Sequence, residues 1–303
     1  MSTVAPATTR VTWPGLVAPA SPRGNTFDRT DWAVLARHWY PVARGTDVAA
    51  ASVAVTLLDE SLVISRTVAG LEVTDDTCGP GDVRTYAAVE RYGLVWTCLR
   101  PDRSHAAAPE TAPIPLMPGW GLPGYQSVTC PPLDVAAGPG RQVEGFLDGA
   151  HLGFLSFNGL DEPETPELHE TPPDAWAYGF DVQLPFIATL VVHLRGEACL
   201  SVMNAASPIS AGRTRMFAPI ARNFNTDQPA RNLIRGSRCV FEQDRALVEL
   251  STVEQSRSDA RLEPRLEATN AATRSSVAYR HALRRLGLSP SLHRLAQPDR
   301  VTG

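Results

Sequence analysis

An aspartate and a histidine lie three residues apart in the apolar stretch "VEGFLDGAHLGFLSFN", residues 143–158. Asp148 and His151 are residue types that ligate metal ions, and their spacing places them near one another on a helix. An iron site built on such a helix needs a second imidazole five residues after the first, but position 156 is Ser156. The plainer alternative is a helix-surface contact between Asp148 and His151, worth about 0.2–0.5 kcal/mol. The stretch therefore predicts either an incomplete metal site or a polar pair with another role.

The composition of the chain limits the classes of partner and mechanism. The 303 residues are 43% hydrophobic and carry a formal net charge of -4, which predicts one or two globular domains. All 28 basic residues are Arg, and no basic stripe exists that could neutralise a run of phosphates. Because Lys is absent, Schiff-base lysines and a phosphate-loop lysine are excluded as mechanisms. We therefore expect no nucleic-acid partner.

The redox and membrane signals are equally limited. The five cysteines are far apart and form no C-x-x-C pair, which predicts buried free thiols rather than disulfides or a zinc site. No run of about 18 apolar residues occurs, and the first residues lack the apolar core of a secretory signal. We therefore expect a cytoplasmic protein that does not bind a membrane.

Shifts in composition divide the chain into five parts. Residues 1–30, rich in Ala, Thr, Pro and Ser, predict a flexible arm, and residues 31–102 predict a small β domain. The Pro- and Ala-rich segment 103–123 predicts an extended connector. A larger domain is expected over 124–290, with a tail at 291–303.

The first domain is expected to open with a short helix. Asp31 is a candidate cap for this helix, which should stop at Pro41 because proline cannot continue it. The apolar runs that follow predict β-strands, with turns at Asp59-Glu60 and at Gly70.

In the larger domain, several strand patterns precede a long helical pattern at about 259–286. The strand candidates are 177–184, 190–207, 214–224 and 238–251. The economical architecture is an α+β domain, in which an antiparallel sheet curves around a C-terminal helix and leaves a pocket between the two.

Taken in order, these stretches resemble the catalytic subunits of Rieske non-heme iron oxygenases, in the monooxygenase and demethylase branch. The resemblance is carried by "WAVLARHWYPVARGTDV", "VTLLDESLVISR", "YAAVERYGLVWTCLRPD", "QVEGFLDGAHLGFLSFNGLDEPE", "TRMFAPIARNF", "FEQDRALVELSTVEQS" and "SVAYRHALRRLG". It implies a Rieske-like small β domain followed by a helix-grip domain of the START/Bet v1 type. It covers about residues 31–288 in collinear order.

The chain departs from the family where the Rieske cluster would be held. The cluster needs a C-x-H and a later C-x-x-H motif, because two thiolates hold one iron and two imidazoles the other. Cys78 matches the first cysteine, but Pro80 stands where the first histidine would be, and no His lies between His38 and His105. We therefore predict that the chain binds no Rieske cluster.

The mononuclear iron site implied by the resemblance is also incomplete. By position, His151 matches the first histidine ligand, Ser156 replaces the second, and Asp244 is the likeliest match for the carboxylate. Asp148 matches the acid that relays electrons, and Gly145 replaces the family's Asn. One imidazole and one carboxylate are too few for a stable site. His169 or His193 is an alternative ligand, but the prediction is that the protein has no metal and no cofactor.

Without metals, the predicted pocket would act through hydrogen bonds and apolar surface. Asp148, His151, Asp244 and Ser156 are the candidate catalytic residues, because a buried cluster of this kind can exchange protons or polarise a carbonyl. The candidate substrate-binding residues, most of which are also core candidates, are His193, Trp176, Tyr178, Phe180, Met203 and Phe217.

Three functions are compatible with this sequence. The first is a cofactor-independent cyclase, cycloaddition catalyst or isomerase that acts on a bulky apolar substrate, such as a polyketide-derived intermediate of bacterial secondary metabolism. The second is a non-catalytic subunit that pairs with an intact partner oxygenase, since the family forms trimers; a homo-oligomer is the related alternative. The third is residual iron-dependent oxygenase activity, with electrons supplied by a partner's cluster.

Overall fold

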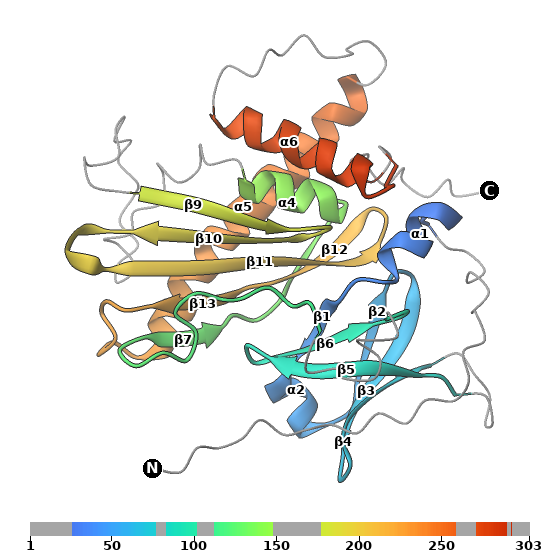
Figure 1. Ribbon diagram of the computed structural model, residues 1–303, viewed down its shortest axis with the longest axis horizontal. Helices are drawn as coiled ribbons and strands as arrows, with labels where there is room; N and C mark the ends of the chain where they lie inside the picture. The colour runs from blue at the N-terminus through green and yellow to red at the C-terminus, as the bar shows by residue number, and fades with distance from the viewer. Residues whose placement is uncertain are drawn as a thin grey trace. The chain divides into compact units, whose positions relative to one another are not determined.

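The computed structural model describes residues 26–76, 83–101, 112–147, 177–258, 271–289 and 292 (Figure 1). The chain forms two compact units, Met1–Ile114 and Pro115–Gly303. This division falls inside the predicted connector, and the other predicted domain boundaries stay predictions. Helices and antiparallel strands are mixed, which confirms the predicted α+β class. Within the described ranges, none of the helices combines the length and apolar composition of a membrane span.

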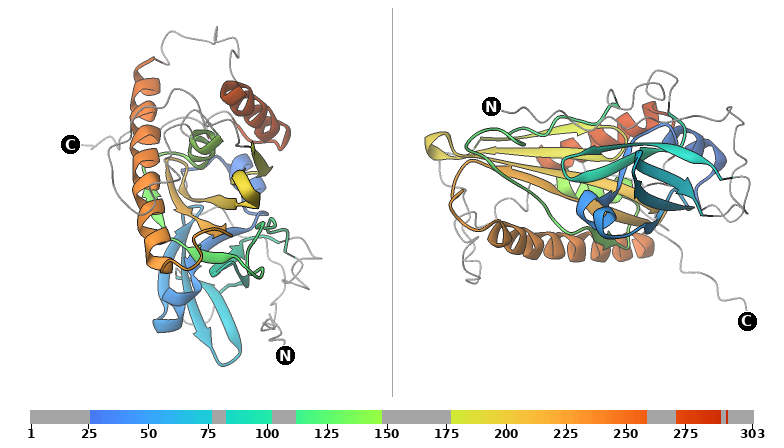
Figure 2. Two further views of the ribbon diagram at one scale, coloured as in Figure 1. Left: turned by 90° about the vertical axis from the view of Figure 1, so that its left-hand side faces the viewer. Right: turned by 90° about the horizontal axis from the view of Figure 1, so that it is seen from below.

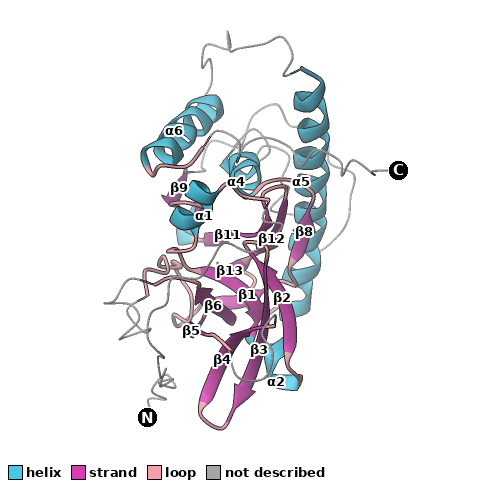
Figure 3. Ribbon diagram, turned by 90° about the vertical axis from the view of Figure 1, so that its right-hand side faces the viewer, coloured by secondary structure: helices cyan, strands magenta, loops and turns pink. Residues whose placement is uncertain are grey.

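The first unit contains one six-stranded antiparallel sheet, in the order β1-β6-β5-β4-β3-β2 (Figure 3). Both predicted turns occur, and the first lies one residue earlier than predicted: Leu58 and Asp59 join β2 to β3 with positive φ, and Glu60 already belongs to β3. Gly70, at φ 124°, opens β4. The elements are α1 (Arg29–Leu35), β1 (Tyr40–Arg44), α2 (Gly45–Ala50), β2 (Val53–Leu57), β3 (Glu60–Thr67), β4 (Gly70–Asp75), β5 (Thr85–Arg91) and β6 (Leu94–Cys98).

The helix α1 begins earlier than the sequence predicted. Asp28 is the N-cap residue, since its carboxylate accepts a 2.8 Å hydrogen bond from the backbone N of Asp31. Asp31, the predicted cap, instead lies in the first turn, where a carboxylate interacts favourably with the positive end of the helix. The backbone N of Thr26 donates to Asp59 Oδ2 at 2.8 Å. The end of the predicted arm is therefore hydrogen-bonded to the turn between β2 and β3.

Among its described residues, the second unit contains a seven-stranded antiparallel sheet and three α-helices. Its main path is β7-β13-β11-β10-β9, and β12 pairs with β11 and with β8. The elements are β7 (Gln126–Thr129), β8 (Leu133–Val135), α4 (Pro139–Leu147), β9 (Ala177–Gln183), β10 (Ile187–His193), β11 (Cys199–Ser210), β12 (Arg213–Phe217), β13 (Pro219–Arg222), α5 (Ala230–Ser258) and α6 (Ala271–Arg285).

The predicted strand at 177–184 is confirmed as β9, whereas two other candidates each contain two strands. The run 190–207 is divided by a 3₁₀ turn at Arg195–Glu197, where Gly196 has φ 70° and Glu197 has φ 66°. The run 214–224 is divided into β12 and β13. Sequence periodicity alone did not locate these breaks, because both sides of each break are apolar.

The predicted strand at 238–251 is wrong, because this segment is the middle of helix α5. Its buried residues Leu233, Ser237, Phe241 and Val248 recur at the spacing of one helical face. Arg238 and Glu242 also form an i, i+4 ion pair, which supports the helix. The helical pattern expected at 259–286 contains α6; residues 259–270 lie outside the described residues.

One face of the second sheet carries a hydrophobic core that α4 and α5 complete. We call it the helix-covered face and define it by Leu190, Leu200 and Met216. The core cluster contains Val128, Cys130, Val135, Ala137, Leu190, Val192, Leu200, Met216, Ala218, Ile220, Leu233, Phe241 and Val248. Figure 2 shows α4 between α5 and α6, in agreement with the contacts that α4 makes with both helices.

Candidate functional site

Helix α4 contains the start of the predicted metal-binding stretch. The part of that stretch within α4 is Val143–Leu147. The catalytic candidates Asp148, His151 and Ser156 lie outside the described residues, as does Trp176. Pro139 opens the helix, a position where the missing N–H of proline costs nothing. Val143 and Leu147 are buried, and the contacts of the helix with β10, β11 and β12 fix its position on the helix-covered face.

Gly145, the position where the sequence resemblance implies an Asn, marks a close approach of two helices. A Cβ atom added at this glycine would lie 2.5 Å from Val248 Cγ2 of α5. This is well inside van der Waals contact, so a larger side chain would require the helices to move apart. The space that an Asn side chain would need at position 145 is therefore filled by α5.

A buried carboxylate ties α4 to α6. Glu144 is 2% exposed, and Arg280 of α6 donates to it from Nε and, at 3.2 Å, from Nη2. Arg141 adds a third hydrogen bond, from Nη1 at 3.3 Å. The hydrogen bond to Glu144 raises the pKa of Arg280, so the guanidinium stays charged at neutral pH. This pair has a structural role, because its donors and acceptors already bond to one another.

Two of the predicted substrate-binding residues lie on the helix-covered face. Phe180 of β9 is half-buried, packs against the core cluster and contacts the ring of Phe146 of α4 edge-to-face, with centroids 5.7 Å apart. Tyr178, which is 50% exposed, contacts Phe180 in the same way at 6.1 Å. The three rings form an apolar row from α4 to the edge strand of the sheet.

The structure does not bring Met203, Phe217 or His193 together with this row. Met203 pairs with Thr189 and Phe217 with Ala205, so both point to the opposite face of the sheet, where they are fully buried. His193 is exposed at the end of β10, on the same side as Met203. Within the described ranges, no group of three His, Cys, Asp or Glu side chains could hold a metal ion.

Asp244, the candidate carboxylate, is presented by helix α5 rather than by a strand. It is half-buried and lies one turn from Phe241 and from Val248, which both belong to the core cluster. Its carboxylate is therefore on the side of α5 that faces the sheet and α4.

Sequence reasoning missed two polar residues on the helix-covered face. Asn204 of β11 is 1% exposed, and neither its Oδ1 nor its Nδ2 has a hydrogen-bond partner in the described part of the chain. Gln142 of α4 is 3% exposed; its Nε2 donates to Met216 Sδ at 3.2 Å, and its Oε1 has no partner among the described residues. The available signal was an Asn inside an apolar strand, where this residue type is disfavoured.

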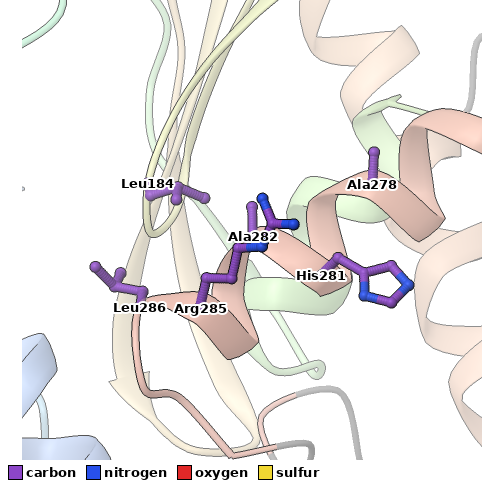
Figure 4. Close-up of a pocket in the computed structure, with 6 residues that line it drawn as sticks. All are labelled: Leu184, Ala278, His281, Ala282, Arg285 and Leu286. Atoms are coloured by element: carbon purple, nitrogen blue, oxygen red, sulfur yellow. The ribbon is translucent and has the colours of Figure 1, made fainter.

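A surface groove of about 750 Å³ lies elsewhere in this unit, along α6 and the turn between β9 and β10 (Figure 4). None of its lining residues is a predicted site residue. They are Leu184, Ala278, His281, Ala282, Arg285 and Leu286.

Comparison with known proteins gives likeness in structure only. No family model matches the chain, and no curated protein does so. The solved structure of NdmA from Pseudomonas putida CBB5 matches with a TM-score of 0.63 and 19% identity over 90% of this chain and 99% of that chain. The structure of NdmB from the same strain matches with a TM-score of 0.60 and 17% identity, over 82% of this chain and 90% of that chain. The structure of dicamba monooxygenase bound to 3,6-dichlorosalicylic acid matches with a TM-score of 0.60 and 15% identity, over 83% of this chain and 97% of that chain.

At these identities the likeness establishes the fold and leaves the activity open. It spans both units, and the matched structures are covered almost completely. The chain therefore has the fold of the Rieske non-heme iron oxygenases, the family that its sequence resembles.

Proposed function

We propose that this protein has lost both metal centres of the Rieske oxygenases and acts as a cofactor-independent cyclase, cycloaddition catalyst or isomerase on a bulky apolar substrate. The fold alone does not define an activity, so the chemistry has to come from the side chains that are present.

The observation that carries the proposal is the short connection between β4 and β5. The two strands pair up to their ends, Thr74 opposite Thr85, and the backbone N of Asp75 donates to the carbonyl O of Arg84 at 3.1 Å. The backbone N of Arg84 donates in turn to Asp75 Oδ1 at 3.1 Å. The intervening residues include one cysteine and no histidine. Because a Rieske cluster needs two thiolates and two imidazoles, the residues present do not fit this group.

The mononuclear site gives a second argument. The family's second histidine is Ser156 here, which leaves His151 and Asp244 as the protein ligands, one fewer than a facial triad requires. At position 145 the family's Asn has become a glycine that contacts Val248 closely. The donor set therefore does not fit a mononuclear iron, and no catalytic step is assigned to one.

The helix-covered face offers chemistry that needs no metal. Its apolar core and the aromatic row can hold a flexible substrate in a reactive conformation. The entropy lost in reaching that conformation is a large part of the barrier to ring formation. Asp148, His151 and Asp244 are the candidates for proton exchange, and Ser156 for a hydrogen bond to a carbonyl. Ring compounds are the ligands named in solved structures of the fold, caffeine for NdmA and dicamba for dicamba monooxygenase.

The proposal can be tested with the full-length protein and the intermediate that accumulates in a strain lacking the gene. The reaction contains a metal chelator and no reductant, and the product is analysed by mass spectrometry. We expect conversion to a product of unchanged mass, and we expect His151→Gln and Asp244→Asn to reduce the rate by about 10²-fold or more. Asp227→Asn, which makes the same carboxylate-to-amide change as Asp244→Asn at an exposed position between β13 and α5, is the matched control.

Two other results would contradict the proposal in different ways. Stoichiometric iron in the purified protein, with turnover that requires reductant and is lost with chelator, would indicate a residual oxygenase. No conversion under either condition, with tight binding to an intact oxygenase subunit, would indicate a non-catalytic partner.

A further inference from the structure

We propose that Asn204 is the anchor for a neutral donor–acceptor edge on the substrate, such as a lactam or an enolised dicarbonyl. The inference deepens the proposed function and rests on it for the idea that an apolar substrate occupies the helix-covered face.

The strand register places Asn204 in the centre of this face. It pairs with Ala188 of β10, and on its own strand its neighbours on the same face are Val202 and Ala206. Val202 packs against the core cluster, and Met216, the residue that Gln142 contacts, pairs with Ala206. Ala188 and Ala206 carry only methyl groups, so a ligand that enters between this face and α4 would meet the amide, which is buried in the ligand-free chain.

The hydrogen-bonding state of Asn204 points to a missing partner. Both of its polar atoms are buried and unpaired within the described residues, although most buried side-chain polar groups in native proteins are bonded. A leucine, whose side chain branches in the same way, would avoid this desolvation cost at the same place. An amide retained at such a position is expected to bond to a ligand or to ordered water.

The chemistry of the amide defines the partner. A carboxamide presents one acceptor and one donor side by side, so its best complement is a neutral group with a donor next to an acceptor. A lactam edge supplies both and forms two parallel hydrogen bonds. Gln142 adds a second acceptor, because its Nε2 is held by Met216 and its Oε1 stays unpaired within the described residues. The ring system that carries this edge would lie against apolar residues such as Phe146 and Phe180.

Three ring compounds of nearly the same size test this inference by isothermal titration of the full-length protein. They are 2-quinolone, which has a lactam edge, quinoline, which has an acceptor alone, and naphthalene, which has neither. We expect 2-quinolone to bind at least about tenfold more tightly than naphthalene, with quinoline between them. Asn204→Leu should abolish this preference and leave naphthalene binding within about twofold.

Ser201 provides a matched control. It lies on the same strand, is fully buried and also has an unpaired oxygen within the described residues, but it points to the opposite face. Ser201→Ala should therefore keep the lactam preference. If Asn204→Leu does not fold, as judged by its circular dichroism, Asn204→Val gives the same test with a side chain favoured in strands.

Equal binding of the three compounds to the wild-type protein, or no binding of any, would overturn the inference, as would a lactam preference that survives at Asn204→Leu. These results are independent of the turnover experiment. A lactam preference in a protein whose turnover requires iron would leave Asn204 as the anchor and refute the metal-free function. Turnover without iron by a protein that shows no preference would refute the anchor alone.

Discussion

The β4–β5 hairpin of the first unit and the helix-covered face of the second differ in how they treat polar groups. In the hairpin, the carboxylate of Asp75 and the backbone of Arg84 bond to one another and close the connection. On the helix-covered face, Glu144 is paired with Arg280, but the amides of Asn204 and Gln142 retain unpaired atoms within the described residues. A region whose polar groups are already bonded to one another serves the fold, whereas unpaired buried groups remain available to a ligand.

Among the variants that test this contrast, Arg280→Met should cause the largest loss in the free energy of unfolding. The change leaves the Glu144 carboxylate buried with only the weaker ion pair to Arg141 identified beside it in the described part of the chain, so we expect the free energy of unfolding to fall by about 3 kcal/mol. Urea denaturation gives the value, and hydrogen exchange should show α6 opening before the sheet. Adding Glu144→Leu should recover part of the loss, because it removes the buried charge. A loss under about 0.5 kcal/mol would mean that the pair does not hold α6 in place.

The next largest loss of stability should follow from Gly145→Asn, which introduces the residue that the sequence resemblance implies at this position. The side chain would collide with Val248, so we expect a loss of about 2 kcal/mol in the free energy of unfolding. Val248→Ala should reduce that loss in the double variant. Gly179→Ala is the control, since a Cβ at Gly179 would meet no atom within 4 Å. A neutral Gly145→Asn would show that α4 and α5 can separate and that an Asn at this position is still tolerated.

The sequence predicted the parts of the molecule that depend on local pattern. The turns at Asp59 and Gly70 were found because turn residues interrupt alternating strands. Helix α5 was missed, since its buried stripe is interrupted by charged residues such as Asp244 and resembles a short alternating strand. The pairing of Glu144 with Arg280 and the contact of Gly145 with Val248 join residues more than 100 positions apart, and no local pattern encodes such contacts. Asn204 was visible as an oddity, but its lack of a partner is a property of the folded state.

Two substitutions, one in each region, should change the free energy of unfolding by smaller amounts and in opposite directions. Asn204→Leu should raise the free energy of unfolding by about 1 kcal/mol, because it removes an unpaired buried amide. Asp75→Ala should lower it by about 1 kcal/mol, because the backbone N–H of Arg84 loses an acceptor. Thermal and urea unfolding of both variants give the signs. If both variants are destabilised equally, Asn204 contributes to the fold and the contrast between the two regions fails.

The smallest change in the free energy of unfolding is expected at Asp134 of β8, which forms an ion pair with Arg215 of β12. This pair has the same chemistry as Glu144 and Arg280 but lies at a more exposed position. Arg215 donates from Nε at 2.6 Å and from Nη2 at 2.8 Å, but the Asp134 side chain is 40% exposed, so Asp134→Asn should cost only about 0.2–1 kcal/mol at neutral pH. The hydrogen bond from Arg215 lowers the pKa of Asp134, so the folded protein keeps this carboxylate charged at a lower pH than the unfolded chain does. The pair therefore contributes fully above the ordinary carboxyl pKa of about 3.9, and its contribution is lost as the pH falls through the lower pKa of the folded state. Unfolding curves of the wild type and Asp134→Asn should converge at acidic pH, and a cost as large as that of Arg280→Met would show that burial does not distinguish the two pairs.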